Sequence, residues 1–192
     1  MLRATAPHLV ACRLGFVVLG RDTSCGEPVK IEATRGDITT ERVDAIVNAA
    51  NTALRRGAGV CGAIFAAAGP DLDAACAAIG ACATGDAVIT PGFSLPARWI
   101  VHTVGPVWHG GAAGEHALLA SCYRRSIEVA RDAGANTIAF PAISTGIFGY
   151  PPAAAAEIAV ATVRELPDSM RVVRLVAFDE ATRRLYAALL GD

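Results

Sequence analysis

Apolar and polar positions along the chain fall into blocks that predict strands and helices in turn. Residues 29–34 alternate apolar and polar side chains, which is typical of a strand, whereas 115–133 carries apolar side chains three and four positions apart, as a helix does. Further blocks predict strands at 44–50, 86–90, 99–104, 137–143 and 171–178 and helices at 60–68, 71–82, 153–166 and 180–190. This order predicts one three-layer α/β domain whose largely parallel sheet is buried on both faces.

The stretch from 44 to 64 holds the first candidate site. An apolar strand ends at Asn51, a basic and glycine-rich loop follows at 55–59, and an apolar helix begins near Val60. Glycines let backbone N–H groups approach an anion, and a helix N-terminus adds the positive end of its dipole. The order therefore fits a phosphate-binding loop, and it fits equally a tight turn that needs glycine only for its backbone angles.

A second loop of this kind occupies residues 144–150, between an apolar strand and a helix that opens with Pro151 and Pro152. In open α/β sheets ligands bind at the carboxyl ends of strands, and both loops fall at that edge. Two facing loops suit a diphosphate, because each can donate N–H groups to one phosphate. The alternative is a pair of independent turns.

Several side chains beside these loops have both a functional and a structural interpretation. Asp37 could accept a hydrogen bond from an exocyclic amine of a base, or cap the segment that follows it. Asn51 could hold a sugar hydroxyl, or cap the backbone of its own loop. Three aromatic residues could pack against a ribose or a base, or belong to the core: Phe148, Tyr150 and Phe178.

The basic and imidazole side chains have simpler interpretations. Arg55 and Arg56 could attract an anionic ligand, but an exposed charged loop also accounts for them. His102 lies inside a predicted strand, so we expect a core histidine with its ring nitrogens satisfied. His109 and His116 flank a glycine-rich loop and are expected to face solvent.

Residues 57–62 also match the G-x-G-x-x-G pattern of dinucleotide-binding folds, which leaves NAD as an alternative ligand. In that fold the glycines leave the strand directly and a ribose-binding acid stands at a strand end about 20 residues on. Here residues 51–56 intervene, and Asp86 begins a strand instead of ending one. Both departures count against NAD.

Composition excludes several classes of protein. The net charge of -1 gives no global basic footprint for nucleic acid, and no apolar run reaches the length of a membrane span. The six cysteines include no C-x-x-C pair and no set with zinc spacing, which favours reduced thiols in a cytoplasmic protein without a metal. Residues 1–27 show no period and no signal-peptide pattern, so we treat them as an extension before a domain at 28–192, which we expect to be monomeric.

Several longer stretches together make the chain resemble the macrodomain family, and within it the MacroD-type branch that includes bacterial O-acetyl-ADP-ribose deacetylases. The stretches that carry the resemblance are GDIT at 36–39, VDAIVNAAN at 43–51, GV at 59–60, AGP at 68–70, TG at 84–85, HTVGPVW at 102–108 and FPAISTGIFGYP at 140–151. The resemblance implies a three-layer fold around a mixed sheet. It also implies a cleft for ADP-ribose, free or attached to a protein, and no cofactor.

The resemblance also implies roles for individual residues. Asp37 would take the adenine amine, Ile38 would contribute backbone beside it, and Phe178 stands at a strand end of the same cleft. Asn51 would reach the distal ribose, with Phe148 packed on it. The diphosphate would be wrapped by two groups of residues: Gly57, Gly59 and Val60 from the first loop, and Ser144, Thr145, Gly146, Ile147 and Phe148 from the second.

The sequence departs from the family pattern in the first loop. Cys61 stands where the family has an aspartate that activates water, Phe65 where it has a histidine, and Arg56 and Ala58 where it has glycines. Binding through backbone N–H groups should survive these changes. Carboxylate-assisted hydrolysis should not, and general-base help is typically worth about 10²–10⁴-fold.

Three hypotheses follow for the activity. The chain could hydrolyse ADP-ribosyl esters with a water held by Asn51 and the ligand's own phosphate, or it could bind ADP-ribose without turnover. Alternatively, Cys61 near a helix N-terminus could act as a nucleophile or base. The competing interpretation of Cys61 is a small residue tolerated where aspartate was not needed.

Overall fold

The computed structural model describes residues 29–165 and 170–191. The predicted extension at 1–27, with Cys12 and Cys25, lies outside these residues, as does the last residue of the helix predicted at 153–166. The four cysteines within the described residues are all free thiols: Cys61, Cys76, Cys82 and Cys122.

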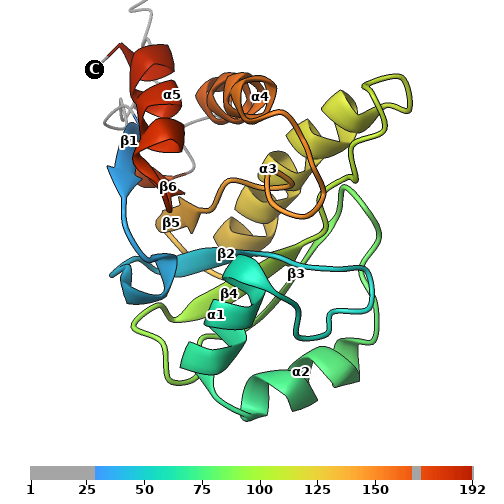
Figure 1. Ribbon diagram of the computed structural model, residues 1–192. Helices are drawn as coiled ribbons and strands as arrows, with labels where there is room; N and C mark the ends of the chain where they lie inside the picture. The colour runs from blue at the N-terminus through green and yellow to red at the C-terminus, as the bar shows by residue number, and fades with distance from the viewer. Residues whose placement is uncertain (1–28, 166–169, 192) are drawn as a thin grey trace, which may run out of the picture.

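Six strands form one mixed sheet in the order β1-β6-β5-β2-β4-β3 (Figure 1). All neighbouring strands run parallel except β3 and β4, which are antiparallel. The strands are β1 (Lys30–Arg35), β2 (Ala45–Ala49), β3 (Ala87–Pro91), β4 (Trp99–Thr103), β5 (Thr137–Phe140) and β6 (Val172–Ala177). The mixed, largely parallel sheet is therefore confirmed.

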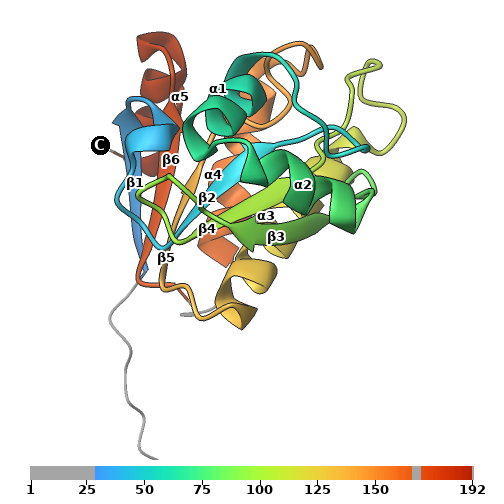
Figure 2. The ribbon, with the colours of Figure 1, turned by 90° about the horizontal axis from the view of Figure 1, so that it is seen from below.

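Helices cover both faces of the sheet. On one face lie α1 (Gly59–Ala68) and α2 (Asp71–Ile79), which stand in front of the strands in Figure 2. On the other face lie α3 (Glu115–Asp132), α4 (Pro152–Glu165) and α5 (Glu180–Leu190). A short 3-10 turn, η1 (Ile38–Thr40), follows β1. The three layers predicted from the sequence are confirmed.

Two apolar cores, one on each face of the sheet, hold these layers together. The core beneath α3, α4 and α5 contains Tyr123, Phe140 and Tyr186, and the core beneath α1 and α2 contains Ile64 and Leu72. Burial of apolar area on both faces is the main favourable term in such a fold.

Within the described residues, no single helix is long and apolar enough to cross a membrane, although α1 and α2 pass that test as a pair bent by 117°.

Two predicted elements end three residues earlier than expected, each for a local reason. The helix predicted at 71–82 ends at Ile79, because Gly80 adopts φ +89° and accommodates the end of the helix. The strand predicted at 137–143 ends at Phe140, because Pro141 has no N–H to donate to a neighbouring strand.

The strands β2 and β5 are joined only at their amino ends. Just two residue pairs are in register, Ala45 with Ile138 and Ile46 with Ala139. Asp44 fastens this end, because its Oδ2 accepts from the Thr137 N–H at 2.9 Å and from the Thr137 hydroxyl at 2.8 Å. Beyond it the two strands diverge toward their carboxyl ends.

The core histidine predicted at His102 is confirmed. Its ring is fully buried, with Nδ1 3.0 Å from Asn48 Nδ2 and Nε2 2.9 Å from the Thr90 hydroxyl. Burial lowers the pKa of His102 to about 4, so the ring is neutral at physiological pH. His109 and His116 are exposed, as expected.

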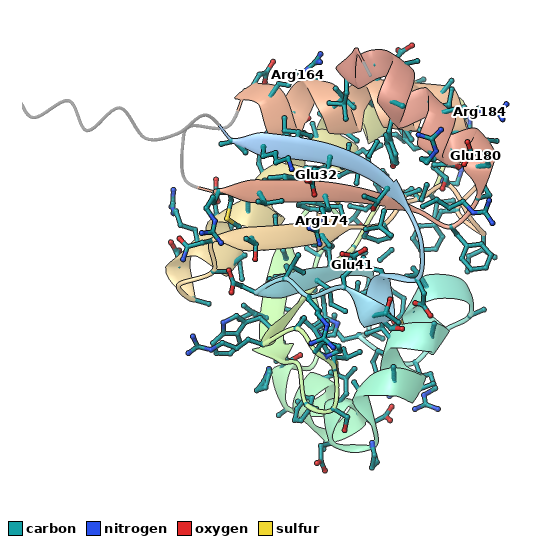
Figure 3. All side chains as sticks on the ribbon, turned by 90° about the vertical axis from the view of Figure 1, so that its left-hand side faces the viewer. Glu32, Glu41, Arg164, Arg174, Glu180 and Arg184 are labelled. Atoms are coloured by element: carbon teal, nitrogen blue, oxygen red, sulfur yellow. The ribbon has the colours of Figure 1, made fainter. Side chains whose placement is uncertain are left out.

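A cluster of charges covers the sheet where β1 and β6 lie side by side (Figure 3). Arg174 on β6 lies between two partly buried carboxylates, with Nε 2.7 Å from Glu32 and Nη1 2.9 Å from Glu41. Lys30 pairs with the same Glu32 at 2.6 Å. These ion pairs satisfy groups on a part of the sheet face that α1 and α2 do not reach.

Replacing Arg174 with alanine should lower the free energy of unfolding by about 1–3 kcal/mol at neutral pH, because two carboxylates lose charged hydrogen bonds. Hydrogen bonds from Arg174 and Lys30 hold the pKa of Glu32 below its ordinary value of 4.5. This contribution is therefore complete above that value and disappears as pH falls through the folded-state pKa. Urea unfolding over a pH series would measure it, and a loss that stays constant toward acid pH would contradict the assignment.

Candidate functional site

A cleft of about 600 Å³ opens at the carboxyl ends of the parallel strands. Its walls come from the segments that follow β1, β2, β5 and β6, with Gly105 after β4 at its floor. The structure places every predicted site residue on this one cleft: Asp37, Ile38, Asn51, Gly57, Gly59, Val60, Cys61, Ser144, Thr145, Gly146, Ile147, Phe148 and Phe178. Both loops line the same cavity, which favours a shared site over two independent turns.

The first wall is the N-terminus of α1. Its N-cap, Ala58, offers no side-chain hydrogen bond, so the N–H groups of the first turn have no partner from the cap. The glycines make this turn geometrically feasible: Gly59 adopts φ +61°, and a Cβ on Gly62 would lie 2.6 Å from the Gly57 carbonyl oxygen. The helix therefore presents free N–H donors and the positive end of its dipole to the cleft.

The second wall is the loop after β5. Ser144 adopts φ +66°, which is unusual for a residue other than glycine, and the loop closes through Gly149 N–H to Gly146 O at 2.9 Å and Tyr150 N–H to Ser144 O at 3.0 Å. Within the described part of the chain, the N–H groups of residues 145–148 have no acceptor. This wall also presents backbone donors to the cleft.

Charged side chains lie at one end of the cleft and not between these walls. Of the residues that line it, only Asp37 and Asp179 carry a charge. Asp179 is the N-cap of α5, and the Thr182 backbone N–H, 2.8 Å away, holds the pKa of its carboxyl below the ordinary range. An anion between the walls would therefore be held by N–H groups, away from both carboxylates.

Asp37 and its neighbours form the acidic end. One carboxylate oxygen of Asp37 caps η1, accepting from the Thr39 N–H at 2.9 Å and the Thr39 hydroxyl at 2.8 Å. The other oxygen has no partner among the described residues, as is the case for the Ile38 N–H. The cap predicted for Asp37 is confirmed, and a second acceptor remains for a ligand.

The three aromatic candidates separate clearly. Phe178 is 90% exposed at the rim of the cleft and Phe148 is half-buried beside the second wall, so neither belongs to the core. Tyr150 is buried against Trp108, with ring centres 4.6 Å apart, and does not line the cleft. For Tyr150 the core interpretation is the right one.

The Asn51 side chain caps its own loop. Its Nδ2 donates to the Arg55 carbonyl at 2.7 Å, and its Oδ1 accepts from the Arg55 N–H at 3.1 Å. The structural interpretation of Asn51 therefore holds. One amide hydrogen and one lone pair stay free toward the cleft it lines.

Cys61 lies in the first turn of α1, directly beside this loop. The residue is 5% exposed, and its thiol lies 3.7 Å from the Arg55 carbonyl, to which it donates, and 3.7 Å from Asn48 Nδ2. Asn48 in turn contacts His102, so Cys61 stands at the cleft end of a buried polar chain.

Arg56 is directed away from the cleft. Its guanidinium bonds the Phe65 carbonyl at 3.2 Å, lies 5.9 Å from the centre of the Phe65 ring and pairs with Asp73 at 3.7 Å. It therefore fastens the loop to α1 and α2, and we do not assign it to an anion in the cleft.

Comparison with known proteins agrees with this geometry. A model of the Macro domain family matches residues 47–159. A macro domain-containing protein of Ralstonia nicotianae, RSc0334, is 54% identical over 164 residues, which cover 85% of this chain and 96% of that protein. The chain belongs to the macrodomain family. The fold expected from the resemblance is confirmed.

Two further macrodomains carry names or ligands that bear on function. An O-acetyl-ADP-ribose deacetylase of Citrobacter rodentium is 51% identical over 168 residues, covering 84% of this chain and 95% of that protein. A Trypanosoma brucei macrodomain, solved in complex with ADP-ribose, matches with a TM-score of 0.78 at 38% identity, covering 84% of this chain and 69% of that one.

The structure of this macrodomain weakens the NAD alternative. Asp86, the proposed ribose-binding acid, does not line the cleft and pairs with Arg125 at 2.9 Å.

Within 29–165 and 170–191 there is no group of three His, Cys, Asp or Glu side chains that could hold a metal ion.

Sequence reasoning missed Gly105 as a site residue. The sequence pattern indicates only a strand break there, yet a Cβ on Gly105 would lie 2.1 Å from Ser144 Oγ and 2.7 Å from Ile143 Cγ2. The glycine lets the floor of the cleft approach the second wall. The signal available in the sequence was a Gly-Pro pair directly after a buried strand.

Gly105→Ala should therefore destabilise the macrodomain by about 1–3 kcal/mol, as overpacking does, and displace Ser144. Gly36→Ala is the matched control, because Gly36 also lines the cleft but its added Cβ would meet nothing within 4 Å. Thermal unfolding of both variants measures the difference, and equal midpoints would show that the contact with Ser144 is not restrictive.

Proposed function

We propose that this macrodomain binds ADP-ribose in the cleft. The observation that carries the proposal is the pair of facing walls with free N–H groups, at the start of α1 and at 145–148, without a cationic side chain between them. Such an arrangement suits a diphosphate, since each wall can serve one phosphate. The Trypanosoma brucei macrodomain with ADP-ribose supports the choice of ligand.

The charges along the cleft orient the ligand. The acidic end suits adenine, because the free oxygen of Asp37 can accept from its amine and the exposed Phe178 ring can stack on the base. The same carboxylates would repel phosphate. The diphosphate then lies between the walls, and the distal ribose reaches Asn51, Cys61 and Phe148.

The proposed reaction is hydrolysis of an ester on the distal ribose, either O-acetyl-ADP-ribose or ADP-ribose on an aspartate or glutamate side chain. Water attacks the ester carbonyl carbon, the bond from that carbon to the ribose oxygen breaks, and the products are a carboxylic acid and the ribose hydroxyl. The free amide groups of Asn51 and a ligand phosphate would hold the water. The Citrobacter rodentium deacetylase supports this reaction class.

A second candidate is a module that binds ADP-ribose without turnover. It is favoured by the absence of a carboxylate beside Asn51, since the charged residues of the cleft lie at the adenine end. It is favoured also by the commitment of Asn51 to the Arg55 backbone. Binding and turnover must therefore be measured separately.

For binding, Phe178→Ala should weaken ADP-ribose by about 1–3 kcal/mol, the usual worth of stacking a base on an aromatic ring. Phe93→Ala is the control, because Phe93 is also an exposed aromatic but lies outside the cleft. Calorimetry with ADP-ribose gives both affinities. Absence of binding heat for the unmodified chain at millimolar ligand would remove both candidate functions together.

For turnover, the unmodified chain should release ADP-ribose slowly from an ester-modified protein, and Cys61→Asp should raise the rate by on the order of 10²-fold, because a carboxylate there can act as a general base. Cys61→Asn is the matched control, with the same shape and no base. Asn51→Ala should abolish the slow rate. Equal rates for Cys61→Asp and Cys61→Asn would show that position 61 does not activate water.

A further inference from the structure

Glu115, at the start of α3, organises the loop that precedes it. The residue is 2% exposed, and its carboxylate accepts from three backbone N–H groups: His109 at 3.0 Å, Gly111 at 3.2 Å and Ala113 at 2.7 Å. Its own N–H and these three donors hold the pKa of Glu115 at about 2. The carboxylate is therefore charged at every pH at which the protein would be assayed.

The loop that Glu115 holds is pressed against Trp108. Gly111 adopts φ +88°, and a Cβ there would lie 2.8 Å from the far edge of the indole ring. The indole also packs on Tyr150, with ring centres 4.6 Å apart, and on His116 at 5.7 Å. Trp108 is thus held between the Glu115 loop and the end of the second wall of the cleft.

Trp108 continues into the second wall through its backbone. Its N–H donates to the Phe148 carbonyl at 2.9 Å, and Tyr150 donates to the Ser144 carbonyl at 3.0 Å. The first bond ties the loop at Phe148 to Trp108, the second joins its two ends, and both take up carbonyl groups. Among the residues that the structure describes, the N–H groups of 145–148 have no acceptor and are the free donors of the loop.

We propose that Glu115 is a positioning residue for the diphosphate: through the 109–113 loop and Trp108 it holds the N–H groups of 145–148 in the arrangement that receives a phosphate. The inference rests on the proposed binding of ADP-ribose and adds a residue that touches no ligand. Preorganised donors bind more tightly because less conformational freedom is lost on binding. Glutamine at 115 would place an NH₂ group against backbone N–H donors and undo the arrangement.

The test compares Glu115→Gln with Val163→Ala, a core variant near the far end of α4 that also lowers stability. Calorimetry well below both unfolding midpoints should give an ADP-ribose affinity on the order of tenfold lower for Glu115→Gln. Val163→Ala should bind like the unmodified chain. Equal affinities for all three, or equal losses in both variants, would overturn the positioning role.

Hydrogen exchange without ligand gives a second readout that is independent of the proposed function. Glu115→Gln should speed exchange of the Gly149 and Tyr150 amides, which close the loop, and leave the amides of β2 unchanged. Unchanged exchange at 149 and 150 would overturn the proposal even if ADP-ribose binds. If the unmodified chain does not bind ADP-ribose, the proposed function fails. Faster exchange at these two amides would still show that Glu115 holds the loop at 144–150 in place.

Discussion

The cleft depends on the divergence of β2 from β5. Two central parallel strands would normally pair along their length, but here only the first two residue pairs form, next to the Asp44 clamp. Pro141 cannot donate to a continued ladder, so β5 ends while β2 runs on. The two connections that leave this gap, to α1 and to α4, therefore begin apart and face each other. A fully paired sheet would bring the backbones of the two walls too close for a ligand.

The groups that the two walls present to the cleft are backbone N–H groups. The cleft therefore tolerates changes of side chain but not of backbone geometry. Gly59, Gly62 and Gly105 are each needed where a Cβ would be strained or would collide, whereas the side chains of Arg56 and Ala58 in the same loop do not close the cleft. The proposed binding of a diphosphate therefore depends little on the side chains of the first loop. The proposed hydrolysis at the distal ribose does depend on them, because a general base must be a particular side chain at a particular distance.

The difference between backbone geometry and individual side chains also decides what the sequence could predict. Periodicity placed the strands and helices, and the rule that parallel strands end at one edge brought Asp37, Asn51 and both loops to a common site. The antiparallel direction of β3 could not be predicted from periodicity, because the pattern of apolar positions is the same for either strand direction. The directions of individual side chains were equally hidden, so the choice between the two interpretations of Asn51 and the contact of Arg56 with Phe65 came only from the structure. Glu115 was missed because its partners are backbone groups of a loop without periodicity.

Arg56, Phe65 and Cys61 are connected through a chain of contacts. Arg56 bonds the Phe65 carbonyl and covers its ring, the Phe65 ring meets His102 edge-on at 6.4 Å, His102 contacts Asn48, and Asn48 contacts Cys61. Residues in one contact network do not contribute additively. A carboxylate at 61 would also face the Arg55 carbonyl, an acceptor, where the thiol now donates. The loop must therefore adjust before a base at 61 can reach water, so the effect of changing position 61 alone does not measure what the connected set controls.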